Sequence, residues 1–468
     1  MEIFERLGMS TSQGTVVRRE TSMAKAVGNT LRGSLGNLVE WYDVYTYTVF
    51  ASYFESQFFD PEDKNSTIYV YAIFAVTFIA RPIGSWFFGR YADRRGRRAA
   101  LTLSVTIMAI CSFIIAILPT KDMIGVWAAV MLTFLRLIQG FATGGEYATS
   151  ATYMSEAALP TRRGFFSSFQ YVTLVGGHVL AQLTLLIMTA TMGKEQISEW
   201  GWRIAFGIGG VAAVVVFWLR RTMDESLSTE HLEAIRSGED TQSGTLRELF
   251  ANHWKPMLIA FLFTLGGTVS FYVYSITGPA TVKKTFTDDP MVATWVNFIA
   301  LTFLMLIQPL GGYISDRIGR KPVFLFFAIG ATLWTWYFVF NLPKQDNPFM
   351  AFLFLIVSYT ILCGYTSINA IFKAELFPAR VRALGVGLSY GLANSLFAGT
   401  APMLYEIAKT NDAVPVFVIY VTMCVIITLI TIIVVMSDKR ASALDIEQGT
   451  DKAKLQSEAA AADDSAAR

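Results

Sequence analysis

Charged residues are scarce in this sequence. Only 16 % of its 468 residues are Asp, Glu, Lys or Arg, whereas 53 % are hydrophobic. Soluble globular chains carry about 25 % charged residues, so the composition argues against a soluble protein. The basic and acidic residues nearly balance, at 38 and 36. We therefore expect no nucleic-acid partner, because nucleic-acid-binding domains are strongly basic.

Cysteine and histidine are also rare, with three residues of each type. The cysteines lie far apart inside apolar runs, at Cys111, Cys363 and Cys424. This spacing suggests neither a disulfide framework nor a metal site. The sequence also contains no recognisable nucleotide-binding loop and no nucleophile–base motif. We therefore expect no metal, no cofactor and no enzymatic activity.

Long polar interruptions are few, and apolar stretches of about 20 residues recur almost from end to end. That length crosses the hydrocarbon core of a bilayer as a helix. The sequence therefore predicts an all-α membrane protein with twelve transmembrane helices. They are expected at about 32–58, 66–89, 99–118, 124–148, 164–192, 202–219, 256–282, 291–312, 322–342, 348–373, 383–407 and 413–436.

The main charged segment, residues 220–255, falls at the middle of the chain. We interpret it as a cytoplasmic linker between two six-helix halves, which are expected at 31–219 and 256–436. Residues 1–30 and 437–468 are polar and are predicted to be tails, the second without structure. Most of the 38 lysines and arginines fall in alternate connections and in the tails. This bias predicts a multi-pass inner (plasma) membrane protein with both termini in the cytoplasm.

Two motifs occur once in each half. Gly89–Arg98 reads GRYADRRGRR, and Gly312–Lys321 reads GYISDRIGRK. In each half, a Glu follows later in the sequence, and an Arg stands seven positions after that Glu. The corresponding residues are Asp93, Arg97, Glu156 and Arg163 in the first half and Asp316, Arg320, Glu375 and Arg382 in the second. The repetition predicts two related halves, and two such halves are typical of secondary transporters, which bind substrate between them.

Charged side chains inside the predicted helices need a functional or structural reason, because each costs at least about 2.5–3.5 kcal/mol at the centre of a bilayer. Glu40 and Asp43 are three residues apart and share one helix face. Two carboxylates so close in an apolar medium cannot both ionise cheaply, which suits a proton carrier. The alternative is that they form structural pairs with a neighbouring helix.

Two arginines also lie deep inside predicted helices. Arg81 precedes Pro82, and a proline bends a helix. The Arg81 guanidinium can form two parallel hydrogen bonds with a carboxylate. That carboxylate is either Glu40 or Asp43, or it belongs to a substrate. Arg136 shares one helical stripe with Glu146, but about 15 Å separates them along a straight helix. Each of the two therefore needs a partner on another helix.

Further polar residues are weaker candidates for substrate contact. Arg203 is expected near the outer end of its helix, where it attracts anions or anchors the membrane interface. The others are Gln170, His178, Tyr272, Tyr274, Asn369 and Tyr390.

The doubled Asp-Arg-x-Gly-Arg loops and Arg136-Leu-Ile-Gln-Gly resemble the major facilitator superfamily. More narrowly, GNLVEWYD at 36–43, ARPIG at 80–84 and GGEY at 144–147 resemble the metabolite:proton symporter family. Within that family, FQYVTL at 169–174, EWGWRI at 199–204 and KAELFPA at 373–379 are most similar to the α-ketoglutarate permeases. The resemblance extends from about residue 30 to 436.

The resemblance implies a gating latch at the cytoplasmic ends of the helices. Asp93 and Arg97 would meet Glu156, Arg163 and the start of the eleventh helix. Asp316, Arg320, Glu375 and Arg382 would do the same opposite the fifth helix. Charge pairs at helix ends suit a latch, since they hold one state and release it without unpacking a core.

Together these features predict proton-coupled symport of a small carboxylate into the cell, with 2-oxoglutarate as the first candidate substrate. The transporter is expected to be a monomer that works by alternating access. Arg81, Arg136 and Arg203 are expected to attract the substrate, and Glu40, Asp43 and Glu146 to carry protons. The alternatives are another solute, namely citrate, shikimate or a zwitterion such as proline or betaine, and, with less support, a membrane enzyme, channel or receptor.

Overall fold

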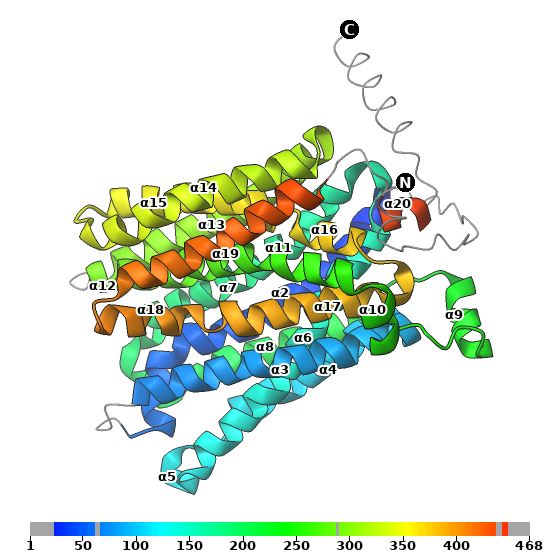
Figure 1. Ribbon diagram of the computed structural model, residues 1–468. Helices are drawn as coiled ribbons and strands as arrows, with labels where there is room; N and C mark the ends of the chain where they lie inside the picture. Colours follow the sequence, from blue (N-terminus) through cyan, green and yellow to red (C-terminus); the bar gives the residue numbers. More distant parts are fainter. Residues whose placement is uncertain (1–22, 61–65, 287–289, 437–441, 448–468) are drawn as a thin grey trace.

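The computed structural model describes residues 23–60, 66–286, 290–436 and 442–447, and all regular structure in them is helical (Figure 1). The first half of the chain contains α2 (Met23–Phe58), α3 (Ser66–Arg95), α4 (Arg97–Ala116), α5 (Lys121–Ile124), α6 (Trp127–Ala157), α7 (Arg163–Gln196) and α8 (Trp202–Arg221). Short helices α9 (Thr229–Ser237) and α10 (Leu246–Asn252) follow in the linker. The first tail, as far as residue 22, lies outside the described residues.

The second half contains α11 (Trp254–Tyr272), α12 (Gly278–Thr285), α13 (Pro290–Ile318), α14 (Arg320–Asn341), α15 (Pro348–Thr366), α16 (Asn369–Glu375), α17 (Arg382–Ala393), α18 (Ala401–Thr410) and α19 (Val414–Val435). The pairs α11–α12, α15–α16 and α17–α18 are each one interrupted span. Helix α20 (Ala443–Glu447) then lies within the predicted tail. The rest of that tail, 437–441 and 448–468, lies outside the described residues.

Eight described segments are long and apolar enough to cross a membrane. One of them, Pro160–Arg221, contains both α7 and α8. Helices α2 and α3 and the interrupted pair α17–α18 complete the twelve. The predicted all-α, twelve-helix architecture is therefore confirmed.

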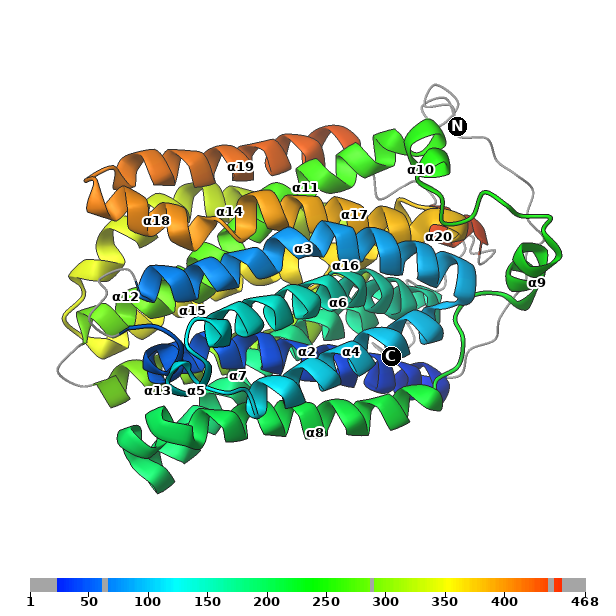
Figure 2. The same cartoon turned by 90° about the horizontal axis from the view of Figure 1, so that it is seen from below.

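The two halves lie side by side; in Figure 2, α17 and α19 of the second half lie above α3, and α8 of the first half lies at the bottom. Helix α3 packs along α17, and α7 packs along α13, so each half contributes a helix to both seams. One continuous apolar core joins buried residues from α2, α7, α11, α15 and α17. The apolar core therefore spans both halves of the molecule.

Close helix crossings depend on small residues. A Cβ added to Gly144 of α6 would lie 2.2 Å from the carbonyl oxygen of Arg81 on α3. Only glycine permits this approach, which sets Arg81 against α6.

Two spans change to a π-helical turn at similar depths. The turns are Val273–Thr277, between α11 and α12, and Asn394–Ala398, between α17 and α18. Such turns are rare in proteins and frequently occur at functional sites. Both begin beside the polar residues described next.

Candidate functional site

Arg81 is buried at the seam between the halves, 1 % exposed. Among the described residues it forms no ion pair, and the Tyr272 hydroxyl is the side-chain group that approaches its guanidinium. Its Cζ lies 4.0 Å from the ring centroid of Phe78 and 5.3 Å from that of Trp41. Aromatic faces stabilise a cation only partly, so N–H donors of this guanidinium remain available to an anion.

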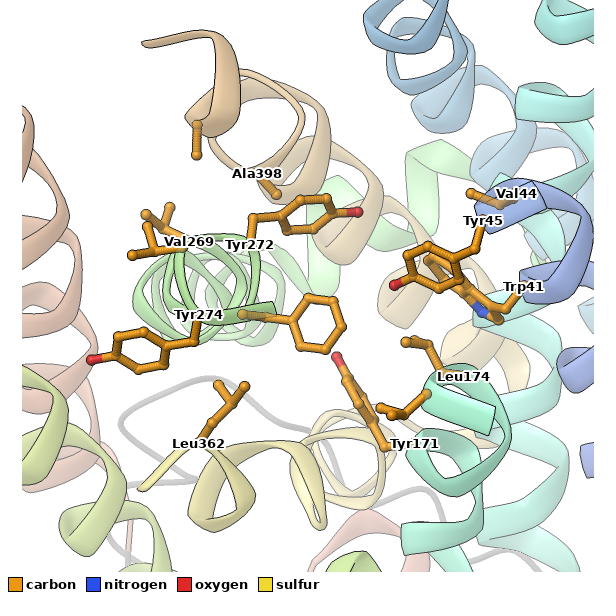
Figure 3. Close-up of a cluster of buried hydrophobic side chains, with 14 of the residues drawn as sticks. Trp41, Val44, Tyr45, Tyr171, Leu174, Val269, Tyr272, Tyr274, Leu362 and Ala398 are labelled. Carbon is orange, nitrogen blue, oxygen red and sulfur yellow. The ribbon is translucent and has the colours of Figure 1, made fainter. Parts of the chain in front are cut away.

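Other unsatisfied polar groups gather around Arg81. The Tyr45 hydroxyl and both polar atoms of the Asn394 amide are buried without hydrogen-bond partners. The Tyr272 hydroxyl lies close to both Arg81 and Asn394. Figure 3 shows the rings of Tyr45, Tyr171 and Tyr272 pointing toward one centre from α2, α7 and α11. Buried polar groups are nearly always satisfied, so this cluster points to an absent ligand.

Asp43 is the partner that Arg136 needs. Arg136 Nη1 lies 3.6 Å from Asp43 Oδ2, and Gln139 Nε2 donates to the same oxygen at 2.7 Å. Ser112 Oγ donates to Asp43 Oδ1 at 2.6 Å. Arg136 also stacks on Tyr47, with its Cζ 4.3 Å from the ring centroid. This network satisfies Asp43, while Arg136 Nε and Nη2 have no hydrogen-bond partner.

Glu146 is paired with Arg220, a partner that the sequence did not predict because Arg220 was assigned to the linker. The guanidinium contacts both carboxylate oxygens, with 3.0 Å between Nη1 and Oε2. Ser104 Oγ donates to Oε2 at 2.6 Å. The arginine passes over Gly36 of α2, where an added Cβ would lie 1.8 Å from Arg220 Nη2. Glu146 is therefore held in an ion pair inside the first half.

Glu40 differs from both of these acids. Its side chain is buried, 4 % exposed, yet Oε1 has no hydrogen-bond partner and no described cation forms an ion pair with it. Glu146, Arg220 and Arg81 act on it electrostatically. Glu40 and Glu146 also line a small internal cavity, about 10 Å³ in volume, together with Asp43 and Arg220. A cavity of that size holds about one water molecule.

Other predicted contacts lie in structural networks or away from this centre. Gln170 donates to Asn37 at 3.2 Å and accepts from Ser150 at 2.9 Å, so it braces α2, α6 and α7. Arg203 Nη1 donates to the carbonyl oxygen of Leu118 at 2.7 Å, beyond the end of α4. Tyr274 points away from Tyr272 (Figure 3), and its hydroxyl lies 2.7 Å from Thr335.

His178 lies at the edge of the central cluster. Its ring stacks on Tyr45 with 4.0 Å between centroids, and its Nε2 lies 3.4 Å from the amide nitrogen of Gln182. It therefore supports one wall of the cluster formed by α2 and α7.

The remaining predicted contacts, Asn369 and Tyr390, meet two residues that the predicted site omitted. Tyr147 of α6 donates its hydroxyl to Asn369 Oδ1 at 2.7 Å and stacks on Tyr390 at 3.5 Å. Lys373 of α16 is fully buried and donates to the Tyr147 hydroxyl at 2.8 Å. In the sequence, Lys373 precedes Ala374-Glu375 at the end of a predicted span, where a lysine usually reaches the membrane interface.

The first latch joins the halves at the ends of α3 and α17. Backbone N–H groups of Ala383 and Leu384 donate to the two oxygens of Asp93, at 3.1 and 2.9 Å. Arg97 contacts Asp93 and lies 3.1 Å from Glu156. The carboxylate at the start of a helix accepts exposed N–H groups and matches the helix dipole.

The second latch repeats this arrangement with α13 and α7. Gly164 and Phe165 donate backbone N–H groups to Asp316 at 2.7 and 2.8 Å. Arg320 lies 2.8 Å from Asp316 and 3.5 Å from Glu375. Each predicted Asp therefore meets the start of the helix expected for it.

Arg163 and Arg382 also have partners that the sequence did not predict. Arg382 reaches across to Glu156 at 2.8 Å. Arg163 pairs with Asp445 of α20, and Glu447 of α20 pairs with Arg382. The predicted structureless tail thus supplies two acids to the latch residues, which its polar composition did not indicate.

Comparisons with known proteins agree with this architecture. The profile of the sugar (and other) transporter family matches residues 30–231 and again residues 227–448. The chain is 42 % identical to the alpha-ketoglutarate permease of Escherichia coli (strain K12) over 396 residues, which are 84 % of this chain and 90 % of the relative. It is 32 % identical to a citrate-proton symporter of Salmonella typhi over 82 % of this chain and 88 % of that relative.

The fold matches a solved structure of the proton:xylose symporter XylE bound to 6-bromo-6-deoxy-D-glucose. The TM-score is 0.76 at 18 % identity, and the match covers 92 % of this chain and 99 % of that one. The chain is therefore a multi-pass membrane transporter that belongs to the sugar (and other) transporter family of the major facilitator superfamily.

Proposed function

We propose that this transporter is a proton-coupled symporter that carries 2-oxoglutarate into the cell. The observation that supports this proposal is Arg81, a fully buried arginine without an ion pair at the seam between the halves. Leaving such a charge unpaired costs about 3–5 kcal/mol, and a substrate carboxylate would remove that cost. The names of the relatives, an alpha-ketoglutarate permease and a citrate-proton symporter, agree with a carboxylate substrate.

Glu40 is our candidate for the proton carrier. Asp43 and Glu146 each have an arginine partner, whereas Glu40 forms no ion pair within the described part of the chain. An unpaired carboxylate in an apolar surrounding is cheaper to hold in its protonated form. Because Glu40 interacts electrostatically with Arg81, substrate and proton would occupy neighbouring positions.

The latches support alternating access in a single chain. We place the latch end in the cytoplasm of a plasma-membrane protein, because the connections there carry most of the lysines and arginines. In this orientation the described structure is closed toward the cytoplasm. Substrate release would then require both latches to open. One chain contains all the groups of this site, so a monomer suffices.

The test is uptake of labelled 2-oxoglutarate by proteoliposomes that contain the purified full-length protein, with an imposed inward proton gradient. We expect accumulation that a protonophore abolishes and that succinate competes. Arg81→Gln should lower uptake at least about tenfold, because the carboxylate loses a charged hydrogen-bond partner. The matched control is Arg221→Gln, which changes an exposed arginine at the end of α8.

Two results would overturn the proposal. Absence of 2-oxoglutarate uptake by the wild type, with uptake of citrate, shikimate, proline or betaine instead, would refute the substrate. Accumulation that survives the protonophore and needs no proton gradient would refute the coupling.

A further inference from the structure

Lys373 is a second buried cation at the seam between the halves. Its side chain is 0 % exposed, and among the residues that the structure describes no carboxylate forms an ion pair with it. The ammonium group has three N–H donors, but a single acceptor is observed, the Tyr147 hydroxyl at 2.8 Å. A lysine ammonium without a counter-ion is among the most costly groups to bury.

Two aromatic rings hold this ammonium group in place. Lys373 Nζ lies 4.8 Å from the ring centroid of Tyr147 and 4.6 Å from that of Tyr390. The Tyr147 hydroxyl is itself fixed, because it donates to Asn369 Oδ1 at 2.7 Å. Tyr147 comes from the first half, whereas Asn369, Lys373 and Tyr390 come from the second. The cation is thus positioned by both halves, as a substrate-binding group must be.

Tyr390 connects this position with Arg81. On α17, Tyr390 is next to Gly391, where an added Cβ would lie 3.3 Å from the Cα of Pro82, the residue that follows Arg81. The seam therefore carries two buried basic side chains near Tyr390, and neither forms an ion pair among the described residues. A ligand with one negative charge would satisfy only one of them, whereas a ligand with a carboxylate at each end would satisfy both.

We propose that Lys373 binds the second carboxylate of the substrate and makes the site selective for dicarboxylates. This inference rests on the proposed function, in which Arg81 binds the first carboxylate. We predict that Lys373 affects selectivity between substrates, whereas a residue that only supports the fold would not.

The experiment compares two ligands of equal chain length, 2-oxoglutarate and 2-oxovalerate, which lacks the second carboxylate. Binding to the purified full-length protein in nanodiscs is measured by ligand-induced thermal stabilisation. We expect wild-type protein to bind 2-oxoglutarate about 10- to 100-fold more tightly, the size of one charge-assisted contact. In Lys373→Met, the affinity for 2-oxoglutarate should fall by that factor and the affinity for 2-oxovalerate should change less than about threefold.

The outcomes separate this inference from the function on which it rests. If Lys373→Met keeps the wild-type preference for 2-oxoglutarate, the inference is wrong and the role of Arg81 is untouched. If the wild-type protein binds both ligands with equal affinity, the inference is wrong. This result does not depend on whether the Lys373→Met variant folds. If Arg81→Gln leaves the affinity for both ligands unchanged, the proposed function is wrong and the inference with it.

Discussion

Three buried acids of the first half have different surroundings, and the difference assigns them different roles. Asp43 and Glu146 are each neutralised by an arginine and by serine or glutamine donors. Glu40 has an unpartnered oxygen and lines the cavity that both other acids also reach. A group that must gain and lose a proton in each cycle cannot be held in a permanent ion pair.

We therefore expect Glu40→Gln to abolish proton-driven accumulation while it leaves exchange of internal for external substrate intact. The glutamine keeps the shape of the side chain but cannot carry a proton. Accumulation under a pH gradient and counterflow at equal pH are measured on the same proteoliposomes. Loss of both activities would contradict a role limited to the proton.

Asp43→Asn serves as the contrasting variant. It should lower stability by about 3–5 kcal/mol, because it leaves Arg136 buried without a counter-charge. The apparent melting temperature of the solubilised protein measures this effect. A melting temperature equal to that of Glu40→Gln would show that the Asp43–Arg136 pair does not stabilise the fold.

Gly36 allows a second test at single-residue scale. Gly36→Ala should lower stability by at least about 1–3 kcal/mol, because its Cβ would overlap Arg220 and disturb the pair with Glu146. The matched control is Gly28→Ala in the same helix, where an added Cβ meets nothing within 4 Å. Thermal unfolding of both variants checks the prediction, and equal melting temperatures would contradict it.

Sequence spacing predicted which buried charges need partners but not which partners they have. The length of α6 separates Arg136 from Glu146, so the sequence correctly required one partner for each on another helix. The Glu146–Arg220 pair depends on a close approach at Gly36 and on α8 extending to Arg221. Neither follows from hydropathy, because a charged residue at the end of an apolar run looks like the start of a loop.

At the scale of helices, the latches join a carboxylate to two backbone N–H groups. We expect Asp93→Asn to increase hydrogen exchange in the first turn of α17, where Ala383 and Leu384 donate to Asp93. Asp316→Asn should instead increase exchange in the first turn of α7, at Gly164 and Phe165. Hydrogen–deuterium exchange with mass spectrometry reads both turns in one experiment, so each variant is the control for the other.

An increase at the same turn in both variants would show that the latches open together rather than one by one. No increase in either would show that these bonds do not hold the helix ends closed. Both results are distinguishable from unfolding, which would raise exchange in all helices.

The positions of the long helices followed from hydropathy, but the interruptions within them did not. The break between α15 and α16 leads into α16, which packs on α6 and α7 of the first half, and the π-helical turn after Ala393 contacts α3. Hydropathy is averaged over a whole span and does not detect such local changes of the backbone. Lys373 follows one of these breaks, which is why its burial could not be read from its place near the end of a span.

At the scale of the whole molecule, α20 connects the two latches. Asp445 pairs with Arg163 at the start of α7, and Glu447 pairs with Arg382 at the start of α17. These arginines belong to different halves, so one short helix holds both. Each pair is at least partly buried, which makes it stronger than an exposed ion pair.

We expect the double variant Asp445→Asn/Glu447→Gln to favour the state open at the latch end. Hydrogen exchange should then rise at the first turns of both α7 and α17, unlike the effect of either latch aspartate alone. The control is Glu230→Gln, which changes an exposed acid of linker helix α9. Unchanged exchange at both turns would mean that α20 only rests on the latch.

The position of α20 after all twelve spans also fixes when closure can occur. A growing chain is made from its first residue, and its early segments fold first. Arg163 emerges long before Asp445, so it waits without this partner while the second half is inserted. The bond between them can form only after the last span has been made. Closure by α20 is therefore a late event of biosynthesis, and a nascent chain that lacks this segment cannot shut its latch end in the same way.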